Sequence, residues 1–200
     1  MRLLLATTNR GKLDEIRALL EGLPVEPLTL DEVGVTDPAV ELGATFAENA
    51  RLKAADYARR TGLLAVAEDS GLEIDALGGA PGVRSARFGG PDCPYQERFR
   101  LIAEQLQCAG APGSTARFTC ALALADPTGI VFEARGTVEG RIAPEPRGEG
   151  GFGYDPIFFY PPFGCTLAEA GDRKSSVSHR GQAFRQLRAF LEHWPGLRGP

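Results

Sequence analysis

The stretch TFAENARLKAADYARRTGLLAVAEDSG, residues 45–71, predicts a helix that leads directly into a buried strand. Thr45 and Glu48 have the spacing of a capping box, which marks a helix N-terminus, and Gly62 stands where a glycine commonly ends a helix. Between them the apolar residues recur at helical spacing: Phe46, Ala50, Ala54, Tyr57 and Ala58. Leu63–Ala67 then forms a short apolar run, which is typical of a buried strand.

The N-terminal segment repeats this alternation of strand and helix. Arg2–Ala6 is a short apolar run, and it is followed by a polar turn over residues 7–11. Lys12–Glu21 has apolar residues at helical spacing, and Gly22 follows it as a stop signal. The chain therefore begins with strand–helix–strand units of the kind that build a parallel sheet.

The rest of the chain adds a hairpin and two helices. We expect a helix over 95–107, hairpin strands over 116–125 and 130–138, an aromatic strand over 152–160 and a last helix capped by Ser178. Residues 31–43, 72–90 and 144–151 are expected to be loops or irregular connections. No linker or repeat divides the chain, so we predict a single domain over residues 1–200 with an α/β fold on a mixed sheet.

The composition excludes several classes of protein. Hydrophobic residues make up 43% and charged residues 24% of the 200 residues, as in an ordinary globular chain. The net charge of −4 and the lack of a basic stripe argue against nucleic acid as a partner. No apolar run is long enough for a membrane span or a signal peptide. The four cysteines show no paired spacing, so we expect free thiols in a cytoplasmic protein.

Lysine is scarce in this chain. Only Lys12, Lys53 and Lys174 accompany 19 arginines among the 22 basic residues. Because arginine serves almost everywhere else, these three positions are candidates for sites that need a compact ammonium group rather than a planar guanidinium. A leftover of coding composition would explain the same count.

The turn Thr7-Thr8-Asn9-Arg10-Gly11-Lys12 joins the end of a predicted strand to the start of a predicted helix. In open α/β sheets such turns bind anions, because free backbone N–H groups and the helix dipole point at the ligand. Lys12 in the first helical turn is unfavourable for the helix alone, and a bound phosphate would reverse that effect. An ordinary connecting turn is the alternative.

Adjacent carboxylates follow the strand at residues 63–67. Glu68 and Asp69 would repel each other unless a cation or solvent relieves them, and Ser70 comes next. Hard oxygen ligands suit Mg²⁺, which also bridges substrate phosphates, and Glu41 in its acidic loop offers a third carboxylate. A solvated acidic turn is the alternative interpretation.

Two later segments combine aromatic and cationic side chains. Phe152-Gly153-Tyr154-Asp155 could stack on a base, although aromatic residues more often belong to a core. Lys174 precedes Ser178-His179-Arg180 at the predicted start of the last helix, where plain capping is the alternative. A metal role for His179 is not expected, because the only other histidine is near the C-terminus.

Taken together, these segments resemble the inosine triphosphate pyrophosphatase family from Leu3 to Leu191. The matching motifs are T-x-N-x-x-K, E-x-G-x-T-F-x-E-N-A-x-x-K-A, A-[DE]-D-S-G-L-E-x-D-A-L-G-G-x-P-G, F-G-Y-D-P-I-F-F and S-H-R-G. The resemblance implies an elongated, mixed, twisted β-sheet flanked by helices, with a nucleotide cleft between two lobes, usually in a homodimer. It also implies hydrolysis of deaminated purine nucleoside triphosphates such as ITP, dITP and XTP to the monophosphate and pyrophosphate.

The same resemblance implies a role for each candidate residue. Asp69 would be the general base, and Glu41 with Asp69 would hold Mg²⁺. Ser70 would contact the substrate, while the triphosphate would be bound by Thr7, Thr8, Asn9, Arg10, Gly11, Lys12 and Lys53. The base pocket would consist of Phe152, Gly153, Tyr154, Asp155, Lys174, His179 and Arg180.

This chain departs from the family pattern at two positions. Glu68 stands where the family usually has an aspartate, which leaves open how it shares metal or water with Asp69. Thr8 stands where a glycine is common. Two other functions are alternatives: a related pyrophosphatase with another base preference, and a nucleotide-binding sensor without catalysis.

Overall fold

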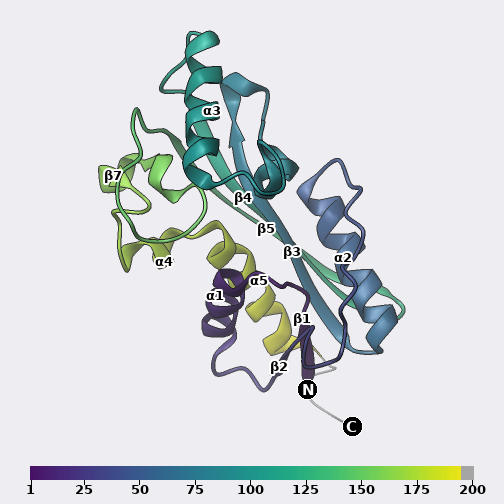
Figure 1. Ribbon diagram of the computed structural model, residues 1–200. Coiled ribbons are helices and arrows are strands. Elements are labelled where there is room, and N and C mark those ends of the chain that lie inside the picture. The colour runs from purple at the N-terminus through teal and green to yellow at the C-terminus, as the bar shows by residue number, and fades with distance from the viewer. Residues whose placement is uncertain (195–200) are drawn as a thin grey trace. The chain divides into compact units, whose positions relative to one another are not determined.

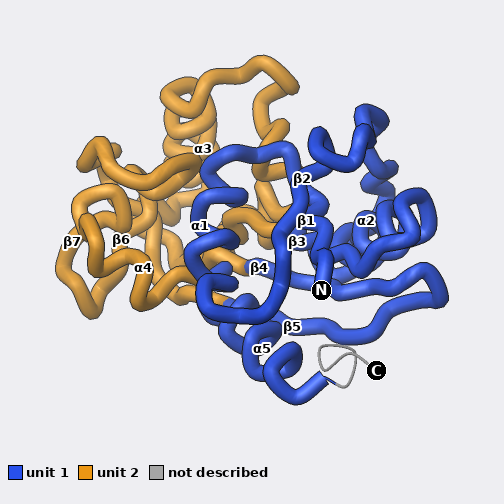
Figure 2. Tube along the Cα trace, turned by 90° about the horizontal axis from the view of Figure 1, so that it is seen from below, with its two compact units in different colours: residues 1–69, 120–136, 180–200 blue, residues 70–119, 137–179 orange. Residues whose placement is uncertain are grey.

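The computed structural model describes residues 1–194, which form two compact units (Figure 2). Unit 1 comprises residues 1–69, 120–136 and 180–194 of this range, and unit 2 comprises residues 70–119 and 137–179. The division agrees with the two lobes that the resemblance implies, while the nucleotide cleft stays a prediction. Within residues 1–194, no helix has the length and apolar character needed to cross a membrane.

The strands form one mixed sheet in the order β2-β1-β3-β4-β5-β6-β7. β1 (Arg2–Leu5) pairs in parallel with β2 (Glu26–Thr29) and with β3 (Leu64–Ile74). β4 (Thr115–Asp126) and β5 (Gly129–Ile142) follow each other through a short turn. At the other end, β6 (Phe158–Tyr160) pairs antiparallel with β5 and with β7 (Cys165–Thr166).

In unit 1, helices cover the sheet from two sides. Figure 1 shows α1 (Arg10–Leu20) and α5 (His179–His193) on one side of β1 and β3, and α2 (Phe46–Thr61) on the other. The core under α1 and α5 takes alternate residues of the strands, Leu3 and Leu5 from β1 and Leu64 and Val66 from β3. This alternation follows from the two-residue period of a strand.

Unit 2 has its own core. α3 (Tyr95–Cys108) buries Phe99, Ile102 and Leu106 in one cluster with Leu72 and Ile74 of β3. Short helices complete the unit: η1 (Asp75–Leu77), η2 (Gly82–Arg87), η3 (Asp155–Ile157), η4 (Pro161–Phe163) and α4 (Arg173–Val177).

The predicted start, end and apolar face of α2 are confirmed, whereas the capping box is only half formed. The Thr45 side chain accepts a hydrogen bond from the Glu48 backbone N–H, and Gly62 ends the helix with a φ of 70°. The Glu48 carboxylate accepts from the Ala44 N–H rather than from the Thr45 N–H. All five residues of the predicted apolar stripe are buried, and the polar Asn49 and Lys53 are buried beside them.

Three expectations about element bounds were wrong. α1 begins at Arg10 rather than Lys12, because the Asn9 side chain caps it by accepting the Lys12 N–H. β3 continues through Glu68-Asp69-Ser70-Gly71 to Ile74, where we expected the strand to end at Ala67. The expected strand over 152–160 is confirmed only at 158–160, because residues 152–157 form turns and η3.

Candidate active site

The two adjacent carboxylates point to opposite faces of β3. Glu68 continues the row of Leu64 and Val66, which belongs to the core under α1 and α5, and Asp69 continues the alternate row. Both are buried, with 2% of Glu68 and 8% of Asp69 exposed. The solvated acidic turn is therefore excluded. Glu68 is stabilised by ion pairs with Lys12 and Arg180, and Asp69 by an ion pair with Lys53.

Asp69 lies among polar residues from α2 and from the acidic loop. Asn49 Nδ2 donates to Asp69 Oδ2 at 3.0 Å, and Asn49 Oδ1 accepts the Gly43 N–H at 2.8 Å. Lys53 Nζ lies 3.1 Å from Glu41 Oε1 and 3.6 Å from Asp69 Oδ1. The ammonium of Lys53 thus sits between two carboxylates that the resemblance assigns to a metal ion.

The surroundings shift the pKa values of this group. Burial raises the pKa of Asp69, and this outweighs the opposing effects of Lys53 and the Asn49 hydrogen bond. Burial alone would lower the pKa of Lys53, but the nearby carboxylates, Asp69 first and Glu41 second, hold that pKa above its ordinary value. A buried carboxylate with a raised pKa is a stronger proton acceptor than an ordinary aspartate.

Glu68 has a different set of partners. Its Oε1 lies 2.5 Å from Lys12 Nζ and 3.5 Å from a guanidinium nitrogen of Arg180, and its Oε2 accepts from the Cys120 thiol at 3.3 Å. Burial alone would raise the pKa of Glu68, but Arg180 and Lys12 hold it well below the usual range. Arg180 also pairs with Glu15 at 2.7 Å.

The predicted phosphate turn precedes α1 as expected. Thr7 Oγ1 accepts the Asn9 N–H at 3.2 Å, and Asn9 Oδ1 accepts the Lys12 N–H at 3.2 Å. The first turn of α1 contains no acidic residue that would offset the positive end of its dipole. Thr8, Arg10 and Gly11 are exposed there and accessible to an anion.

In unit 2, Asp155 organises the aromatic loop. Its Oδ2 accepts the Phe152 N–H at 2.7 Å and pairs with Lys174 Nζ at 2.6 Å. The same ammonium lies 4.6 Å from the centre of the ring of Phe152, a residue that is 39% exposed. The loop thus presents an aromatic face and a cation side by side.

The other base-pocket candidates are distributed between the two units. Gly153, Tyr154 and His179 belong to unit 2, where the centre of the His179 ring lies 5.0 Å from that of Phe118 in a stacked arrangement. Ser70, which the resemblance assigns to substrate contact, also belongs to unit 2. Arg180 belongs to unit 1 and pairs there with Glu15 and Glu68, with only 1% of it exposed. The structure therefore groups Arg180 with Lys12 through Glu68, which the sequence analysis did not foresee.

Several supporting residues were missed. Ser85 accepts hydrogen bonds at its carbonyl from the Tyr154 hydroxyl, at 2.8 Å, and from Arg98, at 3.1 Å. Asn49 was noticed only as part of a motif, although a buried asparagine four residues before Lys53 on the apolar face of a helix is itself a signal. Ser85 and Arg98 gave no comparable signal, because their role depends on partners distant in the sequence.

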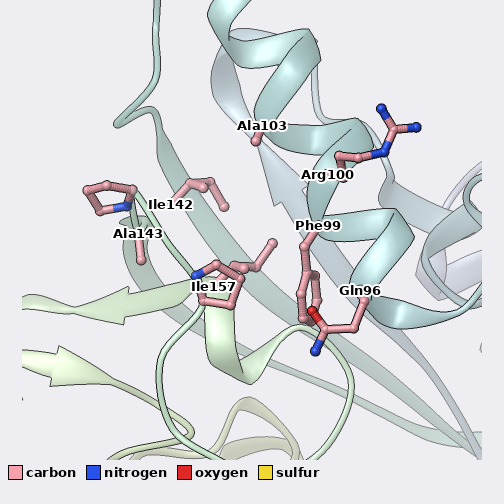
Figure 3. Close-up of a pocket in the computed structure, with 9 residues that line it drawn as sticks. Gln96, Phe99, Arg100, Ala103, Ile142, Ala143 and Ile157 are labelled. Carbon is pink, nitrogen blue, oxygen red and sulfur yellow. The ribbon is translucent and has the colours of Figure 1, made fainter.

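A separate pocket in unit 2 contains none of the predicted residues. It has a volume of about 210 Å³ and is lined chiefly by apolar side chains such as Phe99, Ile142 and Ile157, with Gln96 and Arg100 at its edge (Figure 3). Its lining contains no carboxylate and no lysine. The polar clusters around Asp69 and Asp155 are therefore better candidates for chemistry.

The donor set around Asp69 fits a magnesium ion that shares its coordination with a substrate. Among residues 1–194 there is no group of three or more histidine, cysteine, aspartate or glutamate side chains that could hold a metal by itself. Mg²⁺ commonly takes only one or two carboxylates together with water and substrate phosphates. Glu41 and Asp69 already share one cation, the ammonium of Lys53.

Comparison with known proteins matches residues 3–190 to the Ham1 family. The chain belongs to the Ham1 family. A relative from an Exiguobacterium strain, named dITP/XTP pyrophosphatase, is 48% identical over 96% of this chain and 97% of its own length. A relative of the same name from Thermus thermophilus is 48% identical over 94% of this chain and 90% of its own length.

Solved structures of Ham1 proteins share the fold. The structure of a HAM1 protein from Coxiella burnetii has a TM-score of 0.91 at 42% identity and covers 97% of this chain and 100% of its own. The Staphylococcus aureus Ham1 protein has a TM-score of 0.87 at 33% identity, over 96% of this chain and 98% of its own. The mixed sheet with flanking helices, expected from the sequence, is thereby confirmed for this Ham1 chain.

Proposed function

We propose that this Ham1 protein hydrolyses deaminated purine nucleoside triphosphates, dITP, ITP and XTP, to the nucleoside monophosphate and pyrophosphate. The observation that carries the proposal is the buried Asp69, held by Asn49 and Lys53 beside Glu41. The names of full-length relatives that are 44–48% identical support the same activity. This arrangement disfavours a sensor without catalysis, because a buried carboxylate fixed by Asn49 and Lys53 is placed to accept a proton, which binding alone does not need.

The reaction is NTP + H₂O → NMP + pyrophosphate, with water attacking the α-phosphorus. Asp69 accepts the proton of the water, and Asn49 keeps that carboxylate in one orientation through the Oδ2 contact. Lys12 and Lys53 bind the phosphates and stabilise the negative charge that grows on the leaving pyrophosphate. Because water is the nucleophile, none of the four free cysteines is required.

Glu41 and Asp69 are the residues that would hold Mg²⁺ in this proposal. A bound Mg²⁺ would polarise the phosphoryl oxygens and neutralise charge on the triphosphate. Removal of divalent ions by EDTA should abolish turnover, and excess Mg²⁺ should restore it. Full turnover in EDTA would refute this part of the proposal.

Base selection follows from hydrogen-bond chemistry. Hypoxanthine and xanthine present a 6-oxo acceptor, whereas adenine presents a 6-amino donor. A pocket that offers the Lys174 ammonium beside the Phe152 ring favours the acceptor and leaves the adenine amino group facing another donor. The loop held by Asp155 therefore supports a preference for deaminated purines over ATP.

A substrate panel tests the proposal. Pyrophosphate and orthophosphate release should be measured separately for dITP, ITP, XTP, ATP, GTP, CTP and UTP with Mg²⁺, and Asp69→Asn provides the control for contaminating phosphatases. We expect pyrophosphate alone, with kcat/KM for the deaminated purines higher than for ATP by about 100-fold or more. Orthophosphate as the first product would refute the reaction, and equal rates for ATP and ITP would refute the base preference.

We also propose a homodimer in the cytoplasm. The dimer rests on the family resemblance, and the location rests on a cellular nucleotide pool as substrate and on four free cysteines. Sedimentation velocity at micromolar protein should give a mass near twice the 21.3 kDa of the chain. A monomer at all concentrations would contradict the dimer.

A further inference from the structure

We propose that Glu68 is a positioning residue that acts through Lys12, holding its ammonium in place for the triphosphate. The inference rests on the proposed function, because it assigns Lys12 to phosphate binding. It answers the question raised by the glutamate at position 68, where the family usually has an aspartate. Three observations support it: the partners of Glu68, the place of Lys12 on α1, and the second carboxylate partner of Arg180.

The first observation is that the Glu68 carboxylate is fully engaged within the protein. Oε1 contacts Lys12 at 2.5 Å and Arg180 at 3.5 Å, and Oε2 accepts from Cys120 at 3.3 Å. Only 1% of the Glu68 side chain is exposed. Glu68 also lies on the opposite face of β3 from Asp69, and its direct partners are Lys12, Arg180 and Cys120 rather than members of the group formed by Asp69, Glu41 and Lys53.

The second observation concerns Lys12 itself. A lysine side chain is long and flexible, and the positive end of α1 repels its ammonium because no acidic residue of the first turn offsets the dipole. Pairing with Glu68 overcomes that repulsion and restricts the side chain. With 18% of the Lys12 side chain exposed and three donor hydrogens on its ammonium, the pair leaves donors accessible to a phosphate oxygen.

The third observation is an asymmetry between the two cations. Arg180 has a second carboxylate partner in Glu15, at 2.7 Å, so it keeps an ion pair when the charge of Glu68 is removed. The carboxylate that pairs with Lys12 is Glu68. Glu68→Gln therefore releases Lys12 while the buried guanidinium stays compensated, which makes the variant suitable for a test in the folded protein.

Removing the charge of Glu68 has two opposite effects on a triphosphate. The site becomes more positive by one charge, which favours binding of the anion. At the same time Lys12 is no longer fixed, and a mobile ammonium stabilises the leaving group less well. We therefore expect Glu68→Gln to lose at least tenfold in kcat on ITP without a rise in KM. A residue that served only the fold would lower kcat and raise KM together.

Steady-state kinetics on ITP with matched variants separates these cases. Glu73→Gln is the control, because Glu73 is another glutamate of β3 and pairs only with the Thr119 hydroxyl among the contacts described. It should stay within twofold of wild type. Glu68→Asp restores the charge with a shorter reach and should recover at least part of the lost kcat. A Glu68→Gln enzyme with kcat within twofold of wild type, or with a KM raised in parallel with the lost kcat, would overturn the proposal.

A double-mutant cycle tests whether Glu68 acts through Lys12. If it does, adding Glu68→Gln to a Lys12→Met enzyme should change kcat by less than twofold, because the group that Glu68 positions is already gone. Independent losses that multiply would overturn the proposal.

Calorimetry with inorganic tripolyphosphate in metal-free buffer gives a readout that does not need turnover. Glu68→Gln should bind this anion at least threefold more tightly than wild type, and Lys12→Met should bind it more weakly. Failure of the wild type to release pyrophosphate from any triphosphate would refute the proposed function alone. Weaker binding of tripolyphosphate by Glu68→Gln would refute the role of Glu68 alone.

Discussion

Lys53→Met removes the ammonium that stands between Glu41 and Asp69, and its effect should depend on divalent metal. In wild type the Lys53 ammonium lies 3.1 Å from the Glu41 carboxylate and 3.6 Å from the Asp69 carboxylate. The variant leaves these two carboxylates near each other without the cation that they share. Breaking a buried ion pair costs about 3–5 kcal/mol. Here Asp69 keeps the Asn49 hydrogen bond and 32% of the Glu41 side chain is exposed, so we expect about 2–3 kcal/mol.

A divalent ion should reverse much of this loss in the variant. If Mn²⁺ binds the freed carboxylates with a dissociation constant of about 0.1 mM, 1 mM Mn²⁺ stabilises the folded state by about 1.4 kcal/mol. For a chain of this length that corresponds to a rise in melting temperature of roughly 3–6 °C. In the wild type the Lys53 ammonium competes with the ion, so the rise should be smaller.

Thermal unfolding followed by circular dichroism, in EDTA and in 1 mM Mn²⁺, measures both effects without any substrate. Lys12→Met is the matched control, because it removes a different ion-paired lysine and leaves the group of Glu41, Asp69 and Lys53 intact. It should lose stability without gaining a larger response to Mn²⁺. Equal responses of wild type and Lys53→Met to Mn²⁺ would refute the assignment of Glu41 and Asp69 as metal ligands.

Three further predictions concern the single residues Asp69, Asp155 and Tyr154. Asp69→Asn should lower kcat on ITP by a factor of about 10²–10⁴, because it removes the group that accepts the proton of the water. The melting temperature should stay within a few degrees of wild type, because the new amide is neutral at a site where burial disfavours a charge. More than a tenth of wild-type activity would exclude Asp69 as the base. Asp155→Ala should release Lys174 from the Phe152 loop and lower the ratio of kcat/KM for ITP to that for ATP at least tenfold, and an unchanged ratio would place base recognition elsewhere. Tyr154→Phe should cost about 1 kcal/mol at pH 7 through the lost bond to the Ser85 carbonyl. Burial raises the pKa of Tyr154 to about 12, above its value in the unfolded chain, so the unfolded state releases this proton first as the pH rises. The stability advantage of wild type over Tyr154→Phe should therefore shrink between pH 10 and pH 12. Urea unfolding of both proteins at pH 7, 10 and 11 measures this difference in stability, and a difference that stays constant would contradict the shift.

The sequence predicted best the elements whose signals are local. α2 was predicted from its caps and its apolar stripe, and the α3 face from the spacing of Phe99, Ile102 and Leu106. β2 was missed because Glu26-Pro27-Leu28-Thr29 is short and contains a proline. The proline is tolerated because β2 is at the end of the sheet and pairs only with β1 within the part of the chain that the structure describes.

The course of β3 could not be predicted from the sequence alone. Glu68 and Asp69 look like the start of a turn when their counter-charges are unknown, since uncompensated carboxylates are not buried. The counter-charges come from Lys12, Lys53 and Arg180, which are far away in the sequence. For the same reason the sequence suggested which residues carry charge but not that Arg180 pairs with Glu68 and Glu15.

The Phe152–Tyr160 segment shows the opposite error. Its aromatic residues favour a strand, but Gly153 has a φ of 70° and the Asp155 side chain accepts the Phe152 N–H, which closes a local turn. The strand begins only after Pro156, at Phe158.

The pairing of every lysine with a carboxylate has a consequence for chemical labelling. Lys12, Lys53 and Lys174 are paired with Glu68, with Glu41 and Asp69, and with Asp155, and 11–19% of each side chain is exposed. Besides the α-amino group, these are the only primary amines in the chain. An amine-directed acylating reagent therefore has few targets, and intact-mass spectrometry would show directly how many of them a bound nucleotide shields. Attachment of a dye or a solid support should instead use the exposed thiol of Cys108, which belongs to none of these three ion-paired groups.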